Sequence, residues 1–182
     1  MSAGLWVFVC GASGAGKDSV IGWAQRQLAG DARIVFTRRM VTRAAGPALE
    51  HDEVSLEALH RMHEAGKLAW QWEANGHRYA VAAHYRLDVA AGRVVVVNGS
   101  REHVAALPPA AGRSSVLVTV PQQLLKQRLD GRAREDAAAV AQRLARNTQL
   151  PPLVADLVLA NDGALDQAGA RLAQYLQSLA TP

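Results

Sequence analysis

Short apolar runs alternate along this chain with longer stretches in which apolar residues recur at helical spacing. The apolar runs cover residues 5–10, 33–36, 94–97, 116–120 and 157–159. Short continuous apolar runs are typical of strands that are buried on both faces of a parallel sheet. Because helices must then cover both faces, the pattern predicts an α/β fold of three layers around a five-stranded parallel sheet.

The first and last helical stretches have recognisable limits. Residues 19–28 carry apolar side chains at helical spacing, and Gly30 is the expected stop. Residues 165–179 form an amphipathic pattern, which most simply packs on the sheet.

The connection between the second and third predicted strands is far longer than one crossover helix requires. Within it, Ser55 can cap a helix over residues 56–65. Residues 68–74 and 78–82 are typical of a hairpin around Asn75-Gly76. This connection therefore has a small structure of its own.

We expect a single domain over residues 1–182, because no repeat, low-complexity tract or long linker divides the chain. Its core would comprise residues 1–38 and 93–182. An insertion of about residues 39–92 would lie over that core.

The segment after the first predicted strand is rich in glycine and ends in a lysine. It reads Gly11-Ala12-Ser13-Gly14-Ala15-Gly16-Lys17, and Asp18-Ser19 follows at the start of the next helix. Two glycines that bracket four residues, followed by lysine, form the P-loop pattern, in which backbone N–H groups curl around phosphates and the lysine reaches the outer ones. The preceding strand and following helix supply the context that this pattern requires. We expect residues 11–19 to bind a nucleoside triphosphate.

Asp18 stands where the pattern has serine or threonine, whose hydroxyl binds Mg²⁺. A carboxylate beside a triphosphate would be repulsive without a cation, so Asp18 is the candidate Mg²⁺ ligand. The alternative is that Asp18 caps the N-terminus of the helix.

The other predicted strands also end in polar segments. Arg38-Arg39, Asn98-Gly99-Ser100 and Asn161-Asp162-Gly163 each follow a strand, as the P-loop does. Because active sites in parallel α/β sheets lie at the carboxyl ends of the strands, these segments are candidates to line one cleft. Asn161-Asp162-Gly163 could contact the adenine of a bound ATP or form a simple turn, and the turn is slightly favoured.

The amino-acid composition excludes only some of the possible binding partners. The formal net charge is +4, and three of the 20 basic residues are lysines. An excess of arginine suits several phosphates or a nucleic-acid surface, and genomic base composition would also produce it. No interleaved basic and aromatic pattern supports nucleic-acid binding, and no apolar run approaches the ~20 residues that span a bilayer. With Cys10 as the lone cysteine and no export signal, we expect a cytoplasmic protein.

The P-loop, the long insertion with paired arginines and a late arginine-rich stretch together resemble the guanylate-kinase-like phosphotransferases over nearly the whole chain. The Gly16-Lys17-Asp18-Ser19 form of the loop is similar to that of the bacterial ribose 1,5-bisphosphate phosphokinases. Further segments similar to that family are Thr37-Arg38-Arg39, Val41-Thr42-Arg43, Glu50-His51 to Ser55, Trp72 to Gly76 with Tyr79, Val97 to Arg101, Arg128 to Glu135 and Asn161-Asp162-Gly163.

Two positions argue against guanine as the acceptor. Guanylate kinases use a glutamate to pair with the guanine edge, and alignment on Gly76 and Tyr79 places Trp70 there. Asn98 stands where those enzymes tend to carry an acidic residue. A site that lacks the polar group for the base loses its discrimination. We expect Trp70 and Trp72 to be core residues of the insertion. Ala80 stands where both families favour glycine, a departure that affects the placement of Tyr79.

The resemblance implies a P-loop kinase that transfers the γ-phosphoryl of ATP to ribose 1,5-bisphosphate, with Mg²⁺ as cofactor. The products would be 5-phosphoribosyl 1-diphosphate and ADP. The attacking phosphate oxygen is already ionised, so no general base is required, and catalysis consists of positioning and charge neutralisation.

The resemblance also implies roles for particular residues. Lys17, Arg132, Arg134 and Arg143 would be catalytic, and the arginines of a lid over about residues 128–138 would stabilise charge on the transferring group. The acceptor would be bound by Arg38, Arg39, Arg43, Tyr79 and Asn98. Each of these arginines could instead belong to a solvated face.

Three other functions stay open from the sequence. They are a nucleoside monophosphate kinase, an inactive guanylate-kinase-like interaction module, and a nucleic-acid-binding protein that rests on the isoelectric point alone. The expected partners are ATP and the sugar bisphosphate, with neither nucleic acid nor membrane. A homodimer is also compatible with the sequence.

Overall fold

The computed structural model of this chain describes residues 4–43, 51–108, 110–130, 145 and 152–180. In chain order its elements are β1 (Leu5–Gly11), α1 (Lys17–Gln27), β2 (Ile34–Phe36), β3 (Arg39–Val41), β4 (His51–Glu53), α2 (Leu56–Glu64), β5 (Leu68–Ala74), β6 (His77–Ala82), α3 (Tyr85–Ala90), β7 (Val94–Asn98), α4 (Arg101–Ala106), β8 (Arg113–Thr119), α5 (Gln122–Asp130), β9 (Leu157–Ala160) and α7 (Leu165–Leu179).

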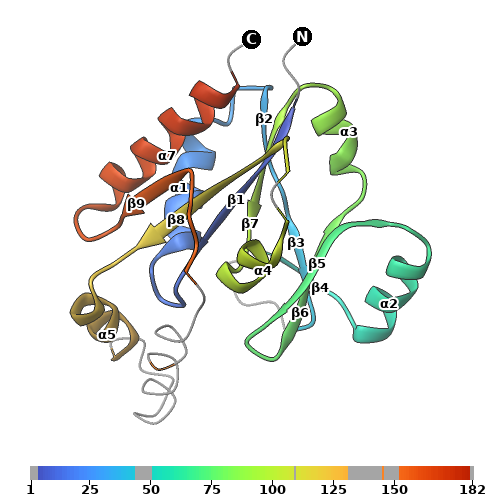
Figure 1. The fold of residues 1–182 in the computed structure, drawn as a ribbon, viewed down its shortest axis with the longest axis horizontal. Coiled ribbons are helices and arrows are strands. Elements are labelled where there is room, and N and C mark those ends of the chain that lie inside the picture. The colour runs from blue at the N-terminus through green and yellow to red at the C-terminus, as the bar shows by residue number, and fades with distance from the viewer. Residues whose placement is uncertain (1–3, 44–50, 109, 131–144, 146–151, 181–182) are drawn as a thin grey trace.

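A five-stranded sheet with the order β2-β7-β1-β8-β9 forms the centre of the molecule, and every neighbouring pair is parallel (Figure 1). These strands are the five that the apolar runs predict, so the predicted parallel sheet is confirmed. The largest shift in a boundary is at β8, which begins at Arg113 rather than at Val116. β1 lies in the middle, so the P-loop that follows it leaves from the centre of the sheet edge.

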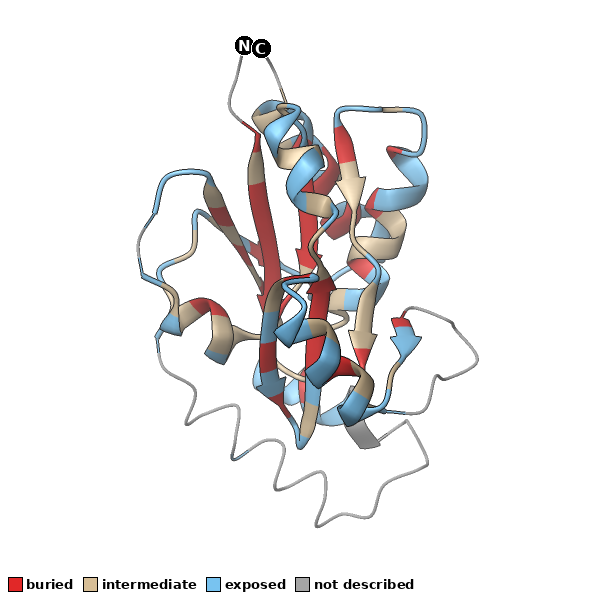
Figure 2. Ribbon diagram, turned by 90° about the vertical axis from the view of Figure 1, so that its right-hand side faces the viewer, coloured by how far each residue is buried: buried red, intermediate tan, exposed pale blue. Residues whose placement is uncertain are grey.

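The two faces of the sheet are buried in different surroundings because side chains alternate along each strand. Val7 and Val9 of β1 join a cluster with residues of α1 and α7 on one face. Trp6, Phe8 and Cys10 point to the other face, where α4 and the strands β5 and β6 cover them. Figures 1 and 2 show these layers and the buried strands between them. Burial raises the pKa of the Cys10 thiol to about 11, which suits a core role.

A second, four-stranded sheet has the order β4-β3-β6-β5 and is built from residues between β2 and α3. β5 and β6 form the hairpin around Asn75-Gly76. Both turn residues have positive φ, 53° at Asn75 and 73° at Gly76, as a two-residue type I′ turn requires. β3 pairs with β6 and extends this sheet. Because β3 follows β2 in the chain and begins at Arg39, it places Arg39 between the central sheet and the hairpin.

Two of the helices have the limits that the sequence predicts, and a third ends at a different residue. The Ser55 hydroxyl accepts a hydrogen bond from the Ala58 N–H and begins α2, and α7 covers the predicted residues. The expected end of the first helix at Gly30 was wrong. α1 ends at Gln27, where the Leu28 N–H bonds to the Ala24 carbonyl, and residues 28–30 form a turn.

Trp72 is a buried core residue, as expected, and Trp70 is half-buried against the same cluster. The Trp70 ring meets Trp6 and Phe8 edge-on, with ring centroids 5.7 and 5.1 Å apart, and Trp72 is buried beside the same cluster. Edge-on contacts of this kind are favourable between aromatic rings.

No helix in the described part of the chain is long and apolar enough to cross a membrane.

His103 of α4 lies among these aromatic rings. Burial lowers its pKa to about 4, and the positive charge of Arg113 contributes. The unfolded chain therefore takes up a proton at this residue near pH 6.5, whereas the folded protein does not until about pH 4.

We predict that the protein loses stability as the pH falls from about 6.5 toward 4, in part because of His103. His103→Phe, which keeps a ring, should remove about 1 kcal/mol of the loss between about pH 7 and pH 5.5, after allowance for solvent screening. Urea unfolding of both proteins at the two pH values measures the difference. Equal losses would contradict a buried neutral histidine.

Candidate active site

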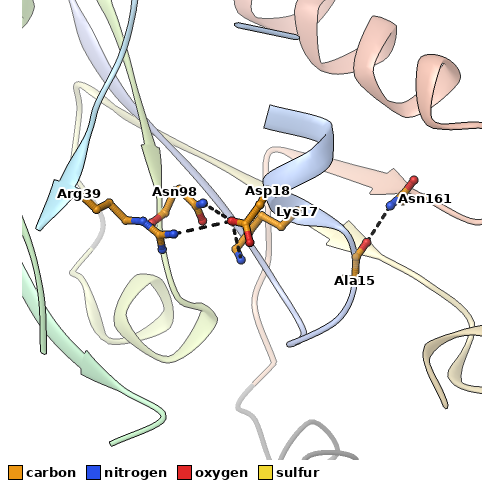
Figure 3. A network of polar contacts seen from close by, with 6 residues as sticks. All are labelled: Ala15, Lys17, Asp18, Arg39, Asn98 and Asn161. Carbon is orange, nitrogen blue, oxygen red and sulfur yellow. Dashed lines mark hydrogen bonds and ion pairs between the residues drawn. The ribbon is translucent and has the colours of Figure 1, made fainter. Parts of the chain in front are cut away.

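Three chain segments meet at the carboxyl edge of the central sheet. β1 runs into the P-loop and α1, β7 ends at Asn98, and β2 is followed by Thr37 and Arg38 before β3 begins. Figure 3 shows side chains from these segments converging on Asp18. The sheet topology thus brings together residues that are far apart in the sequence.

The backbone of the P-loop requires glycine at two positions for different reasons. Gly16 is the N-cap of α1 and has φ 80°, in the left-handed region that favours glycine. A Cβ on Gly11 would lie 2.4 Å from the Val118 carbonyl oxygen of β8, so only glycine fits that close approach. The loop can therefore curl above the end of the sheet as phosphate binding requires.

Asp18 lies in the first turn of α1, and its side chain is directed toward β7 and β3. Its Oδ1 accepts a hydrogen bond from the Asn98 Nδ2 and lies 3.7 Å from the Arg39 Nη2 and 4.0 Å from the Lys17 Nζ. The N-cap residue is Gly16, so the alternative that Asp18 is the capping residue was wrong. The carboxylate is instead the centre of a polar network (Figure 3).

Arg39 is the most tightly held of the candidate acceptor arginines. Its side chain is 11% exposed, and its Nη1 donates to the Asn98 carbonyl at 3.1 Å. Its Cζ lies 5.5 Å from the centre of the Tyr79 ring. A hydrogen bond, an opposite charge and a ring face therefore hold this guanidinium in place.

Arg38 and Arg43 have different surroundings from Arg39. Arg38 is 47% exposed, and its guanidinium binds Asp52 and the His51 carbonyl of β4. Arg43 follows the end of β3 and is exposed. The structure therefore brings Lys17, Arg39 and Asn98 together around Asp18 and leaves Arg43 outside this network.

A cavity of about 290 Å³ opens beside the network, between α1, β2 and β7. Asp18, Arg38, Arg39 and Asn98 line its polar side. Its apolar wall includes Phe36 and residues of α1 and β7. Two arginines and one carboxylate suit an anionic ligand that arrives together with a cation.

Asn161 has a role that the sequence did not predict. It follows β9 and is buried, and its Nδ2 donates to the Ala15 carbonyl of the P-loop at 2.8 Å. A simple turn is therefore an incomplete description of this segment, because the Asn161 side chain also supports the P-loop. A polar residue directly after a buried strand was the available signal, but its partner lies 146 positions away.

Several predicted residues are not placed by the structure. Arg132, Arg134 and Arg143 lie outside the described residues, so their catalytic roles stay predictions. α5, which precedes them, packs Leu125 against Ala12 of the P-loop.

The chain is similar to curated proteins that carry the name ribose 1,5-bisphosphate phosphokinase PhnN. The relative from Pseudofrankia inefficax is 41% identical over 177 residues, covering 95% of this chain and 90% of the relative. The relative from Methylobacterium radiotolerans is 40% identical and covers 96% and 98%. The relative from Burkholderia pseudomallei is 37% identical and covers 99% of both chains. No family model matches the chain.

The chain belongs to the ribose 1,5-bisphosphate phosphokinase family. Among solved structures, guanylate kinase from Anaplasma phagocytophilum matches with a TM-score of 0.70 at 16% identity, covering 100% of this chain and 88% of that one. The guanylate-kinase-like fold is thereby confirmed.

Oxygen atoms that suit Mg²⁺ lie next to the P-loop. The Asp18 carboxylate is 47% exposed, and the buried Oδ1 of Asn98 has no hydrogen-bond partner among the described residues. Carboxylate and amide oxygens are the ligands that Mg²⁺ accepts. In the described part of the chain, no three acidic, histidine or cysteine side chains are grouped to hold a metal, so the fit is to a cation that phosphates and water also ligate.

Loss of the Asn161 side chain should loosen the P-loop. We predict that Asn161→Ala lowers the free energy of unfolding by about 1–2 kcal/mol, the cost of removing a buried hydrogen-bond donor. The same variant should weaken ATP binding several-fold because the loop backbone is less well held. Asp162→Ala, at the exposed neighbouring position, is the matched control. Urea unfolding and ATP titration measure both effects, and equal behaviour of the two variants would exclude this role.

Proposed function

We propose that this protein transfers the γ-phosphoryl of ATP to ribose 1,5-bisphosphate, giving 5-phosphoribosyl 1-diphosphate and ADP. The names of the relatives support the reaction. One observation carries the proposal at the level of the site. The P-loop ends in a carboxylate that contacts Arg39 and Asn98 beside an arginine-lined cavity.

The donor side of the site is the P-loop. Its backbone N–H groups would hold the ATP phosphates at the N-terminus of α1, where the helix dipole favours negative charge. The Lys17 side chain is 15% exposed and lies at the start of the same helix. It would offset charge on the β- and γ-phosphates as the phosphoryl group moves.

The acceptor side is the cavity next to Asp18. A ribose bisphosphate carries two phosphate groups, and Arg38 and Arg39 line the cavity that would receive them. Guanidinium groups bind phosphate through paired hydrogen bonds. The attacking oxygen belongs to a phosphate that is ionised at neutral pH, so the side chains need to hold and orient it rather than remove a proton.

The Trp70 surroundings support a sugar phosphate rather than guanine. At the position where guanylate kinases carry the base-pairing glutamate, this chain has a ring that packs on Trp6, Phe8 and His103. An indole ring packed against the core offers no carboxylate to a base, so base recognition lacks its acidic group at this position.

Asp18 and Asn98 are the residues that would hold Mg²⁺. When bound, the ion would supply positive charge to the phosphate oxygens of the donor. Arg39 and Lys17 also offset the charge of the Asp18 carboxylate. Arg39 therefore contacts both the proposed metal ligand and the cavity for the acceptor.

The proposal also includes residues whose roles rest on the family resemblance alone. Arg132, Arg134 and Arg143 would stabilise charge on the transferring phosphoryl group. Arg43 would add positive charge near the acceptor.

An acceptor screen tests this function. With ATP and Mg²⁺ present, ADP formation should be fast with ribose 1,5-bisphosphate and at least about 100-fold slower with GMP, AMP or dCMP, because no polar group awaits the base. Lys17→Ala should lower kcat by about 1,000-fold, since it removes charge at the transferring group. Rapid turnover of GMP without turnover of the sugar would establish a guanylate-type kinase instead.

A further inference from the structure

Three aromatic rings stand in line behind Arg39. The His103 and Trp72 ring centroids are 4.9 Å apart, with 8° between the ring planes. The Trp72 and Tyr79 centroids are 5.6 Å apart, with 7° between the planes. The Arg39 Cζ lies 5.5 Å from the Tyr79 ring centre. We call His103, Trp72 and Tyr79 the aromatic column.

The aromatic column joins the core to the second sheet. His103 comes from α4, which packs on the central sheet, and Trp72 and Tyr79 face each other across the β5–β6 hairpin. Val41 of β3 pairs with Tyr79, which sets Arg39 two residues away on the same strand. The place of the guanidinium thus depends on how the hairpin is anchored to α4.

The contact between Tyr79 and Arg39 is sheltered from water. Tyr79 and Trp72 are buried, and the Arg39 side chain is 11% exposed. Attraction between a guanidinium and a ring face increases when water is excluded. His103 stays neutral at physiological pH, because burial lowers its pKa to about 4, so it adds no second positive charge near Arg39.

The Tyr79 ring and the polar contacts of Arg39 restrict different motions of the guanidinium. Nη1 is bonded to the Asn98 carbonyl, and Nη2 lies near Asp18. These contacts hold the edge of the guanidinium on one side. The Tyr79 ring limits how far the guanidinium can tilt out of that position.

We propose that Tyr79 and Trp72 are positioning residues, whose rings hold the Arg39 guanidinium ready for a phosphate of the acceptor. The proposal rests on the proposed function of the site. Tyr79 acts through its ring against Arg39, and Trp72 acts through Tyr79. This role differs from the direct contact with the sugar that the sequence predicts for Tyr79.

Paired substitutions separate the ring from the hydroxyl. Tyr79→Leu should raise the KM for ribose 1,5-bisphosphate about tenfold and leave the KM for ATP within about twofold, since a sheltered cation–π contact corresponds to roughly that factor. Tyr79→Phe should restore the acceptor KM to within about threefold of the wild type. Trp72→Leu should likewise raise the acceptor KM more than Trp72→Phe does, with smaller changes than at Tyr79. An acceptor KM as high in Tyr79→Phe as in Tyr79→Leu would assign the effect to the hydroxyl and overturn the proposal.

A double substitution tests whether the ring acts through Arg39. In an Arg39→Lys background, Tyr79→Leu should change the acceptor KM by less than about twofold, because the planar guanidinium is already lost. Independent, multiplying effects would show that the ring acts elsewhere.

The proposal can also be tested without turnover, which separates its failure from failure of the proposed function. If wild-type protein does not turn over ribose 1,5-bisphosphate, the function is wrong, and the column is tested by urea unfolding alone. Arg39→Ala and Tyr79→Leu should then destabilise the protein less together than the sum of their separate effects. Additive effects would overturn the contact as a positioning device. If Tyr79→Leu does not fold, Trp72→Leu replaces it in both cycles, with smaller changes in the same direction.

Discussion

The site depends on one carboxylate oxygen, the Oδ1 of Asp18. This oxygen accepts a hydrogen bond from the Asn98 side-chain amide and lies within ion-pair distance of Arg39 and Lys17. Two cations and a hydrogen-bond donor around one oxygen stabilise a negative charge at the mouth of an anion-binding loop, where it would otherwise oppose phosphate binding. The network holds β3 and β7 against the start of α1. It therefore places the proposed donor and acceptor sites next to each other.

The central sheet makes this network geometrically possible. β1 and β7 are neighbours and parallel, so the P-loop and Asn98 emerge at the same edge. β2 lies on the other side of β7, and the chain turns from it into β3, which carries Arg39. Aromatic residues on one face of β1 then anchor the second sheet through Trp70 and Trp72. The same aromatic face both builds the core and sets the direction of Arg39.

Much of the fold follows from local patterns in the sequence. The five strands, the Asn75-Gly76 hairpin, the Ser55 cap and the last helix are predicted because each depends on periodicity or on turn residues close in sequence. The end of α1 was wrong because Gly30 is only one of several ways to stop a helix, and here the chain turns at Leu28. A glycine near a helix end marks a region rather than a residue.

The sequence predicts which residues belong to the site better than it predicts the contacts between them. The P-loop, Arg39 and Asn98 could be placed at one sheet edge from topology alone. Their convergence on Asp18 could not, because it depends on rotamers of residues 80 positions apart. The same limit applies to Asn161, which supports the P-loop from the end of β9, and to Tyr79, whose ring contacts Arg39. The predictions for Arg132, Arg134 and Arg143 concern residues that the structure does not describe.

The most direct measurement compares Asp18→Asn with Asp52→Asn in steady-state kinetics over a range of Mg²⁺ concentrations. Both substitutions remove one carboxylate next to an arginine of the cavity, but only Asp18 belongs to the P-loop. We expect Asp18→Asn to raise the Mg²⁺ concentration for half-maximal rate about tenfold and also to raise the acceptor KM, whereas Asp52→Asn leaves the Mg²⁺ dependence unchanged. An unchanged Mg²⁺ dependence and acceptor KM in Asp18→Asn would contradict the account.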